Sequence, residues 1–273
     1  MKNLLLIAAM CLGSLFPAHA QKSEDIMIQG SEGKLSAILQ TPVMKKGQKV
    51  RLAVICHGFG SNKERPLLKA IADSLQDKGI ASIRFDFAGC GKSEGKFEDM
   101  TVPQQIEDAK NVIAYAEGLD WTGDISIVGH SQGGVVASMV AGQLKGGIRS
   151  VALCAPAAVL RDDALRGNTQ GANYDPFHLP EYVEMHRGNK LGRAYFLTAQ
   201  TLPIYETASQ YEGPVFIAHG TWDKVVPYTY SERYKQNYKN CELVLMQGVD
   251  HSFSNEVARA KTAGKVAEFI RKH

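Results

Sequence analysis

A serine between two glycines is the residue of this sequence best placed to act as a nucleophile. The apolar run at 125–128 predicts a buried strand, and the small residues at 135–144 predict a helix. Between them lies Gly129-His130-Ser131-Gln132-Gly133, the pattern of a nucleophile elbow, a tight turn that holds a serine hydroxyl out at a sheet edge. Side chains at the flanking glycines would collide with neighbouring backbone. The alternative is a glycine-rich turn whose serine has no chemical role.

A serine at its ordinary pKa needs a base within hydrogen-bond reach, and the base needs a group that orients it. In proteins with this elbow the chain order is Ser, then Asp or Glu, then His. Asp223 follows a predicted strand that ends at His219, and His251 lies between the last predicted strand and the last predicted helix. Both positions are loops at the sheet edge that carries Ser131. The sequence therefore predicts a catalytic triad of Ser131, Asp223 and His251.

Other titratable residues near these motifs have plainer explanations. Asp250 is adjacent to His251 in the chain, so the two side chains are poorly placed to pair. Asp86 fits a carboxylate that stabilises a turn. We expect His130 only to pack beside the nucleophile, and His219 to be a buried histidine whose hydrogen bonds are satisfied.

An oxyanion hole requires two backbone N–H groups that face the developing negative charge. One is predicted at Gln132, directly after the nucleophile, and the other at Phe59, in the loop after an earlier strand. Gly58 and Gly60 allow that loop to approach a substrate closely. His57 is expected to brace the loop rather than to transfer protons.

Strands that alternate with amphipathic helices carry these residues, which predicts an α/β fold with a mostly parallel sheet wrapped by helices on both faces. A hairpin is expected first, with strands at 25–28 and 35–41. Thr101 and Gln104 form the capping-box pattern that opens a further helix. Ligands of such sheets bind beyond the carboxyl ends of the strands. Further strands are predicted at 52–56, 80–87, 150–154, 214–219 and 243–246, and helices at 66–78, 227–238 and 257–271.

The alternation stops between residue 155 and about residue 209. This stretch is rich in Asn, Tyr, His, Pro and charged residues, and no strand is convincing within it. It is too long for an ordinary connection, which indicates a functional segment. We interpret 155–209 as a cap inserted over the active site, with a helix at 193–199. The catalytic domain as a whole is expected to span residues 21–273.

The sequence begins with the pattern of an export signal. Lys2 supplies the positive start, residues 4–15 supply an apolar core, and Ala18-His19-Ala20 is a small-x-small cleavage site. The core is too short for a comfortable membrane span. We expect residues 1–20 to be a signal peptide and the protein to be exported, either periplasmic or secreted. Stable insertion in a membrane is not expected.

The charge balance argues against nucleic acid as a partner. The whole sequence has 31 Lys and Arg against 28 Asp and Glu. Loss of Lys2 with the signal leaves a net charge of about +2, which is too small for a polybasic surface. The sequence leaves open whether the protein forms a homodimer.

Neither a metal nor an organic cofactor is expected. Cys56, Cys154 and Cys241 lie in or beside apolar runs, where free thiols behave as small hydrophobes. In an oxidising compartment Cys56 and Cys90 could form a disulfide, and the sequence alone does not decide whether they do. No Cys or His spacing matches a metal centre.

The elbow, the acid turn and the histidine turn together resemble the α/β-hydrolase superfamily over essentially the whole chain after residue 20. Further motifs are similar to those of bacterial cinnamoyl (feruloyl) esterases. In the core they are His57-Gly58-Phe59, Arg84-Phe85-Asp86-Phe87 with Gly89, Gly91 and Ser93, and the segment 129–138. In the predicted cap they are the segments 155–160, 163–165, 167–171 and 202–206.

The resemblance implies hydrolysis of ferulate, caffeate or p-coumarate esters, either small molecules or oligosaccharide-linked esters, and a part in plant cell-wall degradation. In that family a cap aspartate and glutamine contact the ring hydroxyl, and they fall here on Asp163 and Gln170. On the residues alone, Asp163 would equally suit a helix N-cap and Gln170 a solvated loop position. Tyr195 is predicted to line the pocket, although a core or surface tyrosine fits nearly as well. The sequence departs from the family in its export signal and at 172–174.

Two other functions fit the same residues. One keeps the triad and changes the acyl group, as in a lipase, a general short-chain esterase or an acyl-peptidase. The other is a binding protein on a hydrolase fold without catalysis. The intact set of Ser131, Asp223 and His251 argues against the second.

Overall fold

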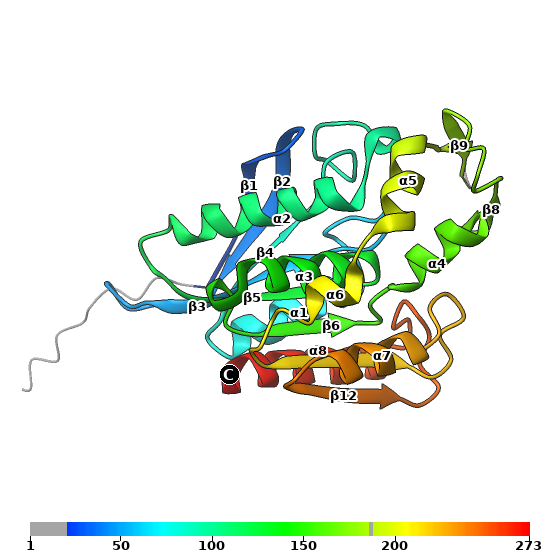
Figure 1. Ribbon diagram of the computed structural model, residues 1–273. Coiled ribbons are helices and arrows are strands. Elements are labelled where there is room, and N and C mark those ends of the chain that lie inside the picture. Colours follow the sequence, from blue (N-terminus) through cyan, green and yellow to red (C-terminus); the bar gives the residue numbers. More distant parts are fainter. Residues whose placement is uncertain (1–20, 186–187) are drawn as a thin grey trace, which may run out of the picture.

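The computed structural model describes residues 21–185 and 188–273 (Figure 1). An eight-stranded sheet has helices on both faces, as the α/β prediction required. β2 is antiparallel to both of its neighbours, β1 and β4. Every other pair of adjacent strands in this sheet is parallel. In spatial order the strands are β1 (Lys22–Gly30), β2 (Gly33–Thr41), β4 (Ala81–Phe85), β3 (Val50–Cys56), β5 (Thr122–His130), β6 (Val151–Cys154), β11 (Val215–Gly220) and β12 (Cys241–Met246).

The predicted signal peptide, residues 1–20, lies outside the described residues. Within the part of the chain that the structure describes, no helix is both long enough and apolar enough to cross a membrane.

The sheet divides the hydrophobic core into two layers, and helices pack against each face. In β3, Ala53 and Ile55 point into one layer, whereas Leu52 and Val54 point into the other. A strand buried on both faces reads as a continuous apolar run, which is why this segment was recognisable in the sequence. The first layer contains α1 (Pro66–Asp77) and α8 (Glu256–Lys272), and the second contains α2 (Val102–Glu117), α3 (Gln132–Leu144) and α7 (Thr229–Asn237).

The start of α2 is set by its first residues. Thr101 Oγ1 accepts the Gln104 N–H at 3.2 Å, and the Gln104 side chain accepts the Thr101 N–H at 3.4 Å. Each bond satisfies a backbone donor that the first turn of a helix leaves free. The predicted capping box is confirmed.

The segment between β6 and β11 contains helices and two short hairpins. The predicted helix at 193–199 is confirmed as α5 (Arg193–Thr201). The prediction that the segment has no strand is wrong, because strands of two or three residues are too short to show an alternating pattern. The other elements are α4 (Val159–Arg166), β7 (Asn168–Thr169) paired with β8 (Ala172–Asn173), β9 (Tyr182–Glu184) paired with β10 (Lys190–Gly192), and α6 (Ile204–Ala208).

Figure 1 shows α4, α5, β8 and β9 grouped beyond the ends toward which the arrows of β6 and β12 point. These are the carboxyl ends of the parallel strands, where α/β proteins bind their ligands. The name cap is used for residues 155–209. Two 3₁₀ turns, η1 (Phe97–Asp99) and η2 (Lys145–Gly147), complete the described elements.

Candidate active site

Ser131 occupies a strained turn between β5 and α3. Its φ of 57° and ψ of −124° are a backbone conformation that non-glycine residues seldom adopt. Neighbouring strands hold the turn in place, because the Ser131 N–H donates to the Cys154 carbonyl at 3.0 Å and the Ser131 carbonyl accepts the Ala157 N–H at 3.0 Å. The end of β6 and the residues after it thus fix the position of the hydroxyl.

The glycines of the turn are required by close backbone approach. A Cβ at Gly129 would lie 2.1 Å from the Gly133 carbonyl oxygen, and a Cβ at Gly133 would lie 2.3 Å from the His57 carbonyl oxygen. The end of β3 and the start of α3 therefore pack backbone against backbone beside Ser131. This is the reason for glycine that the sequence suggested.

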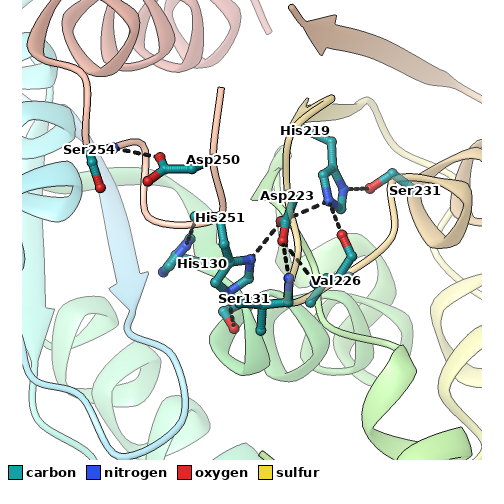
Figure 2. A network of polar contacts seen from close by, with 10 residues as sticks. His130, Ser131, His219, Asp223, Val226, Ser231, Asp250, His251 and Ser254 are labelled. Carbon is teal, nitrogen blue, oxygen red and sulfur yellow. Dashed lines mark hydrogen bonds and ion pairs between the residues drawn. The ribbon is translucent and has the colours of Figure 1, made fainter. Parts of the chain in front are cut away.

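Figure 2 shows Ser131, His251 and Asp223 joined in a line of hydrogen bonds. His251 Nε2 lies 2.9 Å from Ser131 Oγ, and His251 Nδ1 lies 2.7 Å from Asp223 Oδ2. Since a carboxylate only accepts, Nδ1 carries the proton and Nε2 is free to accept the serine proton. The structure thus brings the three residues of the predicted triad together in the order that proton transfer requires.

Asp223 is held on both carboxylate oxygens. Oδ1 accepts the Val225 and Val226 N–H groups, each at 2.8 Å, and Oδ2 also faces His219 Nε2 at 3.1 Å. Burial by itself raises the pKa of Asp223, but hydrogen bonds from His219 and His251 outweigh it and hold the pKa below its usual range. Asp223 is therefore ionised at neutral pH. The sequence identified His219 as buried but gave no sign that it touches this carboxylate.

His130 does more than pack beside the nucleophile. Its Nε2–H donates to the His251 backbone carbonyl at 2.9 Å, and the two rings lie 5.1 Å apart. Burial, aided by the nearby His251, lowers the pKa of His130 to about 3, so its ring is neutral at physiological pH. The prediction of simple packing is corrected, because a neutral histidine here fixes the backbone of the loop that carries His251.

The two predicted oxyanion donors are free N–H groups near Ser131. Neither the Phe59 N–H nor the Gln132 N–H donates a hydrogen bond to any of the described residues. A Cβ at Gly58 would lie 2.9 Å from Ser131 Cβ, so the loop that carries Phe59 lies directly against the nucleophile. Two unsatisfied donors next to a serine hydroxyl are the components of an oxyanion hole.

The Gln132 side chain links the site to α2 and to the cap. Its Oε1 accepts the Tyr195 hydroxyl at 2.7 Å, and its Nε2 donates to Gln105 Oε1 at 2.8 Å. Phe59 packs edge-on against the Tyr195 ring, with centroids 5.7 Å apart. The cap helix α5 thus touches both residues that supply the free N–H groups. The sequence had no signal for these contacts, which join distant segments.

His57 braces the loop after β3, as expected. Its Nδ1–H donates to the Gly58 carbonyl at 2.7 Å, and its Nε2 accepts the Phe87 N–H at 3.0 Å. Burial lowers the pKa of His57 to about 4, which keeps it neutral with one donor and one acceptor. Its ring connects the loop after β3 to the loop after β4, away from any proton transfer.

A buried ion pair, which the sequence did not reveal, closes the same two loops. Lys63 Nζ lies 2.7 Å from Asp86 Oδ2, and their side chains are only 2% and 1% exposed. The Lys63 N–H also donates to Asp86 Oδ1 at 2.6 Å. Asp86 therefore stabilises a turn, as predicted, and its partner Lys63 had no signal in the sequence.

The three cap residues with predicted substrate contacts lie in different surroundings. Asp163 is in the middle of α4, where it pairs with Arg166 at 2.7 Å, so the alternative helix N-cap role is wrong. Gln170 is exposed at the tip of the β7–β8 hairpin with a φ of 51°. Tyr195 is almost fully buried, and its hydroxyl is bound to Gln132. Substrate contact by these three stays a prediction.

The four described cysteines, Cys56, Cys90, Cys154 and Cys241, are free thiols. Burial raises the pKa of Cys154 to about 12 and that of Cys90 to about 12, so neither is a reactive thiolate. Among the described residues, no group of three His, Cys, Asp or Glu side chains is arranged to hold a metal ion.

Comparison with known proteins agrees with this geometry. A family described as serine aminopeptidase, S33, matches residues 47–172. A structure of Est1E from Butyrivibrio proteoclasticus with ferulic acid bound superposes with a TM-score of 0.85 and 33% sequence identity, over 90% of this chain and 98% of that one. A second Est1E structure gives a TM-score of 0.81 and 30% identity over 91% and 98%.

One curated relative is an uncharacterized 31.7 kDa Escherichia coli protein from the traX-finO intergenic region. It is 36% identical over 66 residues, which is 24% of this chain and only 23% of that protein. The Est1E matches extend over nearly the whole of both chains. With the eight-stranded sheet and the elbow, they establish that the chain belongs to the α/β-hydrolase superfamily and, within it, to the family of Est1E.

Proposed function

We propose that the protein is a serine carboxylesterase that hydrolyses hydroxycinnamate esters. The observation that carries the proposal is the hydrogen-bonded line from Ser131 Oγ through His251 to Asp223, next to two free backbone N–H groups. This set of groups performs acyl transfer on several unrelated folds.

In the proposed reaction, His251 Nε2 takes the Ser131 proton while Oγ attacks the ester carbonyl carbon. Negative charge develops on the carbonyl oxygen, where the Phe59 and Gln132 N–H groups stabilise it. His251 then gives the proton to the departing alkoxide, and the acyl group stays on Ser131. Water, deprotonated by His251, attacks the acyl-enzyme and releases the free acid and the original serine. Asp223 stabilises the imidazolium in both steps.

Two observations support a hydroxycinnamate as the acyl group. The matching Est1E structure holds ferulic acid, and the match covers nearly the whole of both chains. Asp163 stands on α4 close enough for its charge to raise the pKa of Tyr174 and of Tyr195, although burial is the larger cause for both. A polar carboxylate near cap tyrosines offers an acceptor for a ring hydroxyl. We assign ring contact to Asp163, Gln170 and Tyr195.

The test is a panel of purified wild type and Ser131→Ala against methyl ferulate, methyl p-coumarate and p-nitrophenyl acetate. The wild type is expected to prefer the methyl hydroxycinnamates in kcat/KM, and Ser131→Ala to lose at least about 10⁴-fold in kcat. A fluorophosphonate probe should label the wild type only. Comparable turnover by the alanine variant would contradict the assignment of Ser131 as the nucleophile. Equal kcat/KM on all three esters would indicate a general esterase instead of a hydroxycinnamate esterase.

A second candidate is hydrolysis of peptide or amide bonds. The matched family is described as a serine aminopeptidase, and the same triad cleaves amides. Adding an aminoacyl p-nitroanilide to the panel separates the two candidates. A kcat/KM for the anilide above that for methyl ferulate would favour the peptidase.

We further propose that the protein works after export, on esters released from or linked to plant cell-wall oligosaccharides. The support is the signal-like pattern at residues 1–20 and the proposed substrate. Fractionation of the source cells with an antibody tests this. A protein found only in the cytoplasm, with its first 20 residues intact, would contradict it.

A further inference from the structure

Asp223 is bound by two histidines, and only one of them faces Ser131 (Figure 2). The second is His219, in β11 four positions before Asp223. Its side chain is fully buried, and the Asp223 carboxylate beside it has no exposed surface either. A buried imidazole next to a buried carboxylate needs a role or a compensating set of hydrogen bonds.

The neighbours of His219 determine which nitrogen carries its proton. Nε2 faces two oxygens that only accept, Asp223 Oδ2 at 3.1 Å and the Val226 carbonyl at 2.9 Å. Nε2 is therefore protonated and donates to both. Nδ1 lies 2.6 Å from Ser231 Oγ, whose hydroxyl donates to it in the neutral ring. Both ring nitrogens are satisfied, and the ring cannot turn without losing a bond.

The contact with His219 falls on the oxygen that His251 uses. Oδ1 is occupied by the Val225 and Val226 N–H groups, so these amides fix one end of the carboxylate. Oδ2 receives His251 Nδ1–H at 2.7 Å and His219 Nε2–H at 3.1 Å. His219 is thus the only described side chain besides His251 that donates to Asp223.

We propose that His219 is a positioning residue for the triad. Its Nε2–H holds Asp223 Oδ2 in line with His251 Nδ1, and it shares the negative charge of that oxygen. As a consequence, Asp223 orients His251 but stabilises its protonated form less than an unshared carboxylate would, so His251 can still give up its proton. The inference rests on the proposed function, since it concerns the basicity of His251 during acyl transfer.

Other charged or titratable groups around the triad must be kept apart from this effect. His130, at the end of β5, lies beside His251 and is neutral, because burial lowers its pKa to about 3. Arg65, ahead of α1, also lowers the pKa of His130. Asp250 precedes His251, but its carboxylate is bound to the Ser254 N–H at 2.8 Å. Of these groups, none donates a hydrogen bond to Asp223 among the described residues.

The experiment compares His219→Leu, His219→Gln and Tyr234→Phe with the wild type on methyl ferulate. Tyr234 is the matched control, because its hydroxyl makes a buried hydrogen bond to Ser138 and does not touch the triad. We expect His219→Leu to lose about 10-fold to 100-fold in kcat with KM changed less than about twofold, by analogy with other residues that orient a reacting group. The pH of half-maximal kcat/KM on the acid side should rise, since an unshared carboxylate holds the imidazolium longer.

His219→Gln keeps a donor and should recover most of the kcat and the wild-type pH profile, whereas Tyr234→Phe should match the wild type in both. Superimposable pH profiles for wild type and His219→Leu would overturn the proposal. So would a His219→Gln enzyme as slow as His219→Leu.

A measurement on the unchanged protein covers the case in which His219→Leu does not fold. A fluorophosphonate forms a bond from Ser131 Oγ to phosphorus and releases fluoride and the serine proton, so His251 Nε2 loses its hydroxyl partner. ¹⁵N-histidine NMR follows the imidazole N–H groups before and after this change. The His219 Nε2–H resonance should shift when Ser131 is modified, because both rings donate to one oxygen. An unmoved resonance would contradict the inference. A wild type that neither reacts with the phosphonate nor hydrolyses any ester would instead defeat the proposed function.

Discussion

The loops that carry the triad and the cap segment, residues 155–209, are held in place by different means. Around Ser131 and His251, hydrogen bonds join distant segments of the chain, because His251 binds both Ser131 and Asp223 and its carbonyl accepts the His130 Nε2–H. In the cap, Asp163 pairs with Arg166 one turn away on the same helix, and Gln170 projects from a hairpin tip. The triad is held by long-range contacts, whereas Asp163 has a local partner and Gln170 is exposed; the cap residue Tyr195, bound to Gln132, is held like the triad.

This difference separates reaction from substrate choice. Groups that must keep their geometry within a few tenths of an ångström lie where the sheet and its two helical layers constrain them. Asp163 and Gln170, for which we propose contact with the aromatic ring, lie on an insertion that can change without disturbing the sheet. Changes in the core loops should therefore affect kcat or folding, whereas changes in the cap should affect discrimination between esters.

The largest effect is expected from Asp223→Asn. The neutral amide of Asn lacks the negative charge that both histidines bind, and its N–H₂ group favours the wrong tautomer of His251. We therefore expect kcat to fall by about 10⁴-fold. Asp250→Asn is the matched control, because that carboxylate binds only the nearby Ser254 N–H and not the triad, and it should stay within about twofold of wild type. Steady-state kinetics on methyl ferulate give both numbers. A loss below about tenfold for Asp223→Asn would mean that His251 is oriented by other groups.

Breaking the buried ion pair should be nearly as costly, but in stability. Lys63→Met leaves the Asp86 carboxylate buried without its cation, which typically destabilises a protein by about 3–5 kcal/mol. Lys110→Met removes an exposed pair with Glu107 and should cost less than about 0.5 kcal/mol. Urea unfolding followed by circular dichroism compares the two. Equal losses would show that the core loops are no more constrained than the surface.

Acid should weaken the core region through His57. The pKa of this histidine is lowered by burial from 6.5 to about 4, so the unfolded chain takes up its proton first as pH falls. The contribution of neutral His57 to the free energy of unfolding is complete above pH 6.5. It is lost as the pH drops toward about 4, by up to about 3 kcal/mol. The free energy of unfolding at about pH 7, 6, 5 and 4 should decline accordingly, and less steeply in His57→Gln. Identical slopes for the two proteins would rule out His57 as the source.

The smallest effect, and the one that tests the cap, is expected from Asp163→Ala. Loss of one ring contact should lower kcat/KM for methyl ferulate about tenfold and leave p-nitrophenyl acetate within about twofold. Asp175→Ala removes another cap carboxylate, one that pairs with His178, and should leave both esters unchanged. Equal losses of kcat/KM on the two esters after Asp163→Ala would mean that Asp163 supports the fold and does not select the substrate.

Much of the sheet was predictable because its strands carry their own signal. Continuous apolar runs marked β3 and β6, and the box of Thr101 and Gln104 marked the start of α2. The proximity of Ser131, Asp223 and His251 could be inferred from chain order and from the rule that parallel strands end at one edge. These inferences need only local patterns and one topological rule.

The contacts that tune the site were not predictable, because they join residues with no sequence relation. Nothing in a polar loop marks Lys63 as the partner of Asp86, and nothing places Tyr195 on Gln132. His219 was recognised as buried, but its bond to Asp223 depends on how the turn after β11 folds. The hairpins of the cap could not be recognised, since their strands are too short to show an alternating pattern.

The pairing of β6 with β11 has a practical consequence for enzyme engineering. Val151 pairs with Val215, and the register continues without interruption to Cys154 and Ala218, although the entire cap is inserted between the two strands in sequence. The sheet therefore closes as if the insertion were absent. We expect that the residues from α4 to the start of α6 can be exchanged for those of a relative as one segment, provided that Tyr195 is kept, because its hydroxyl binds the Gln132 side chain beside Ser131.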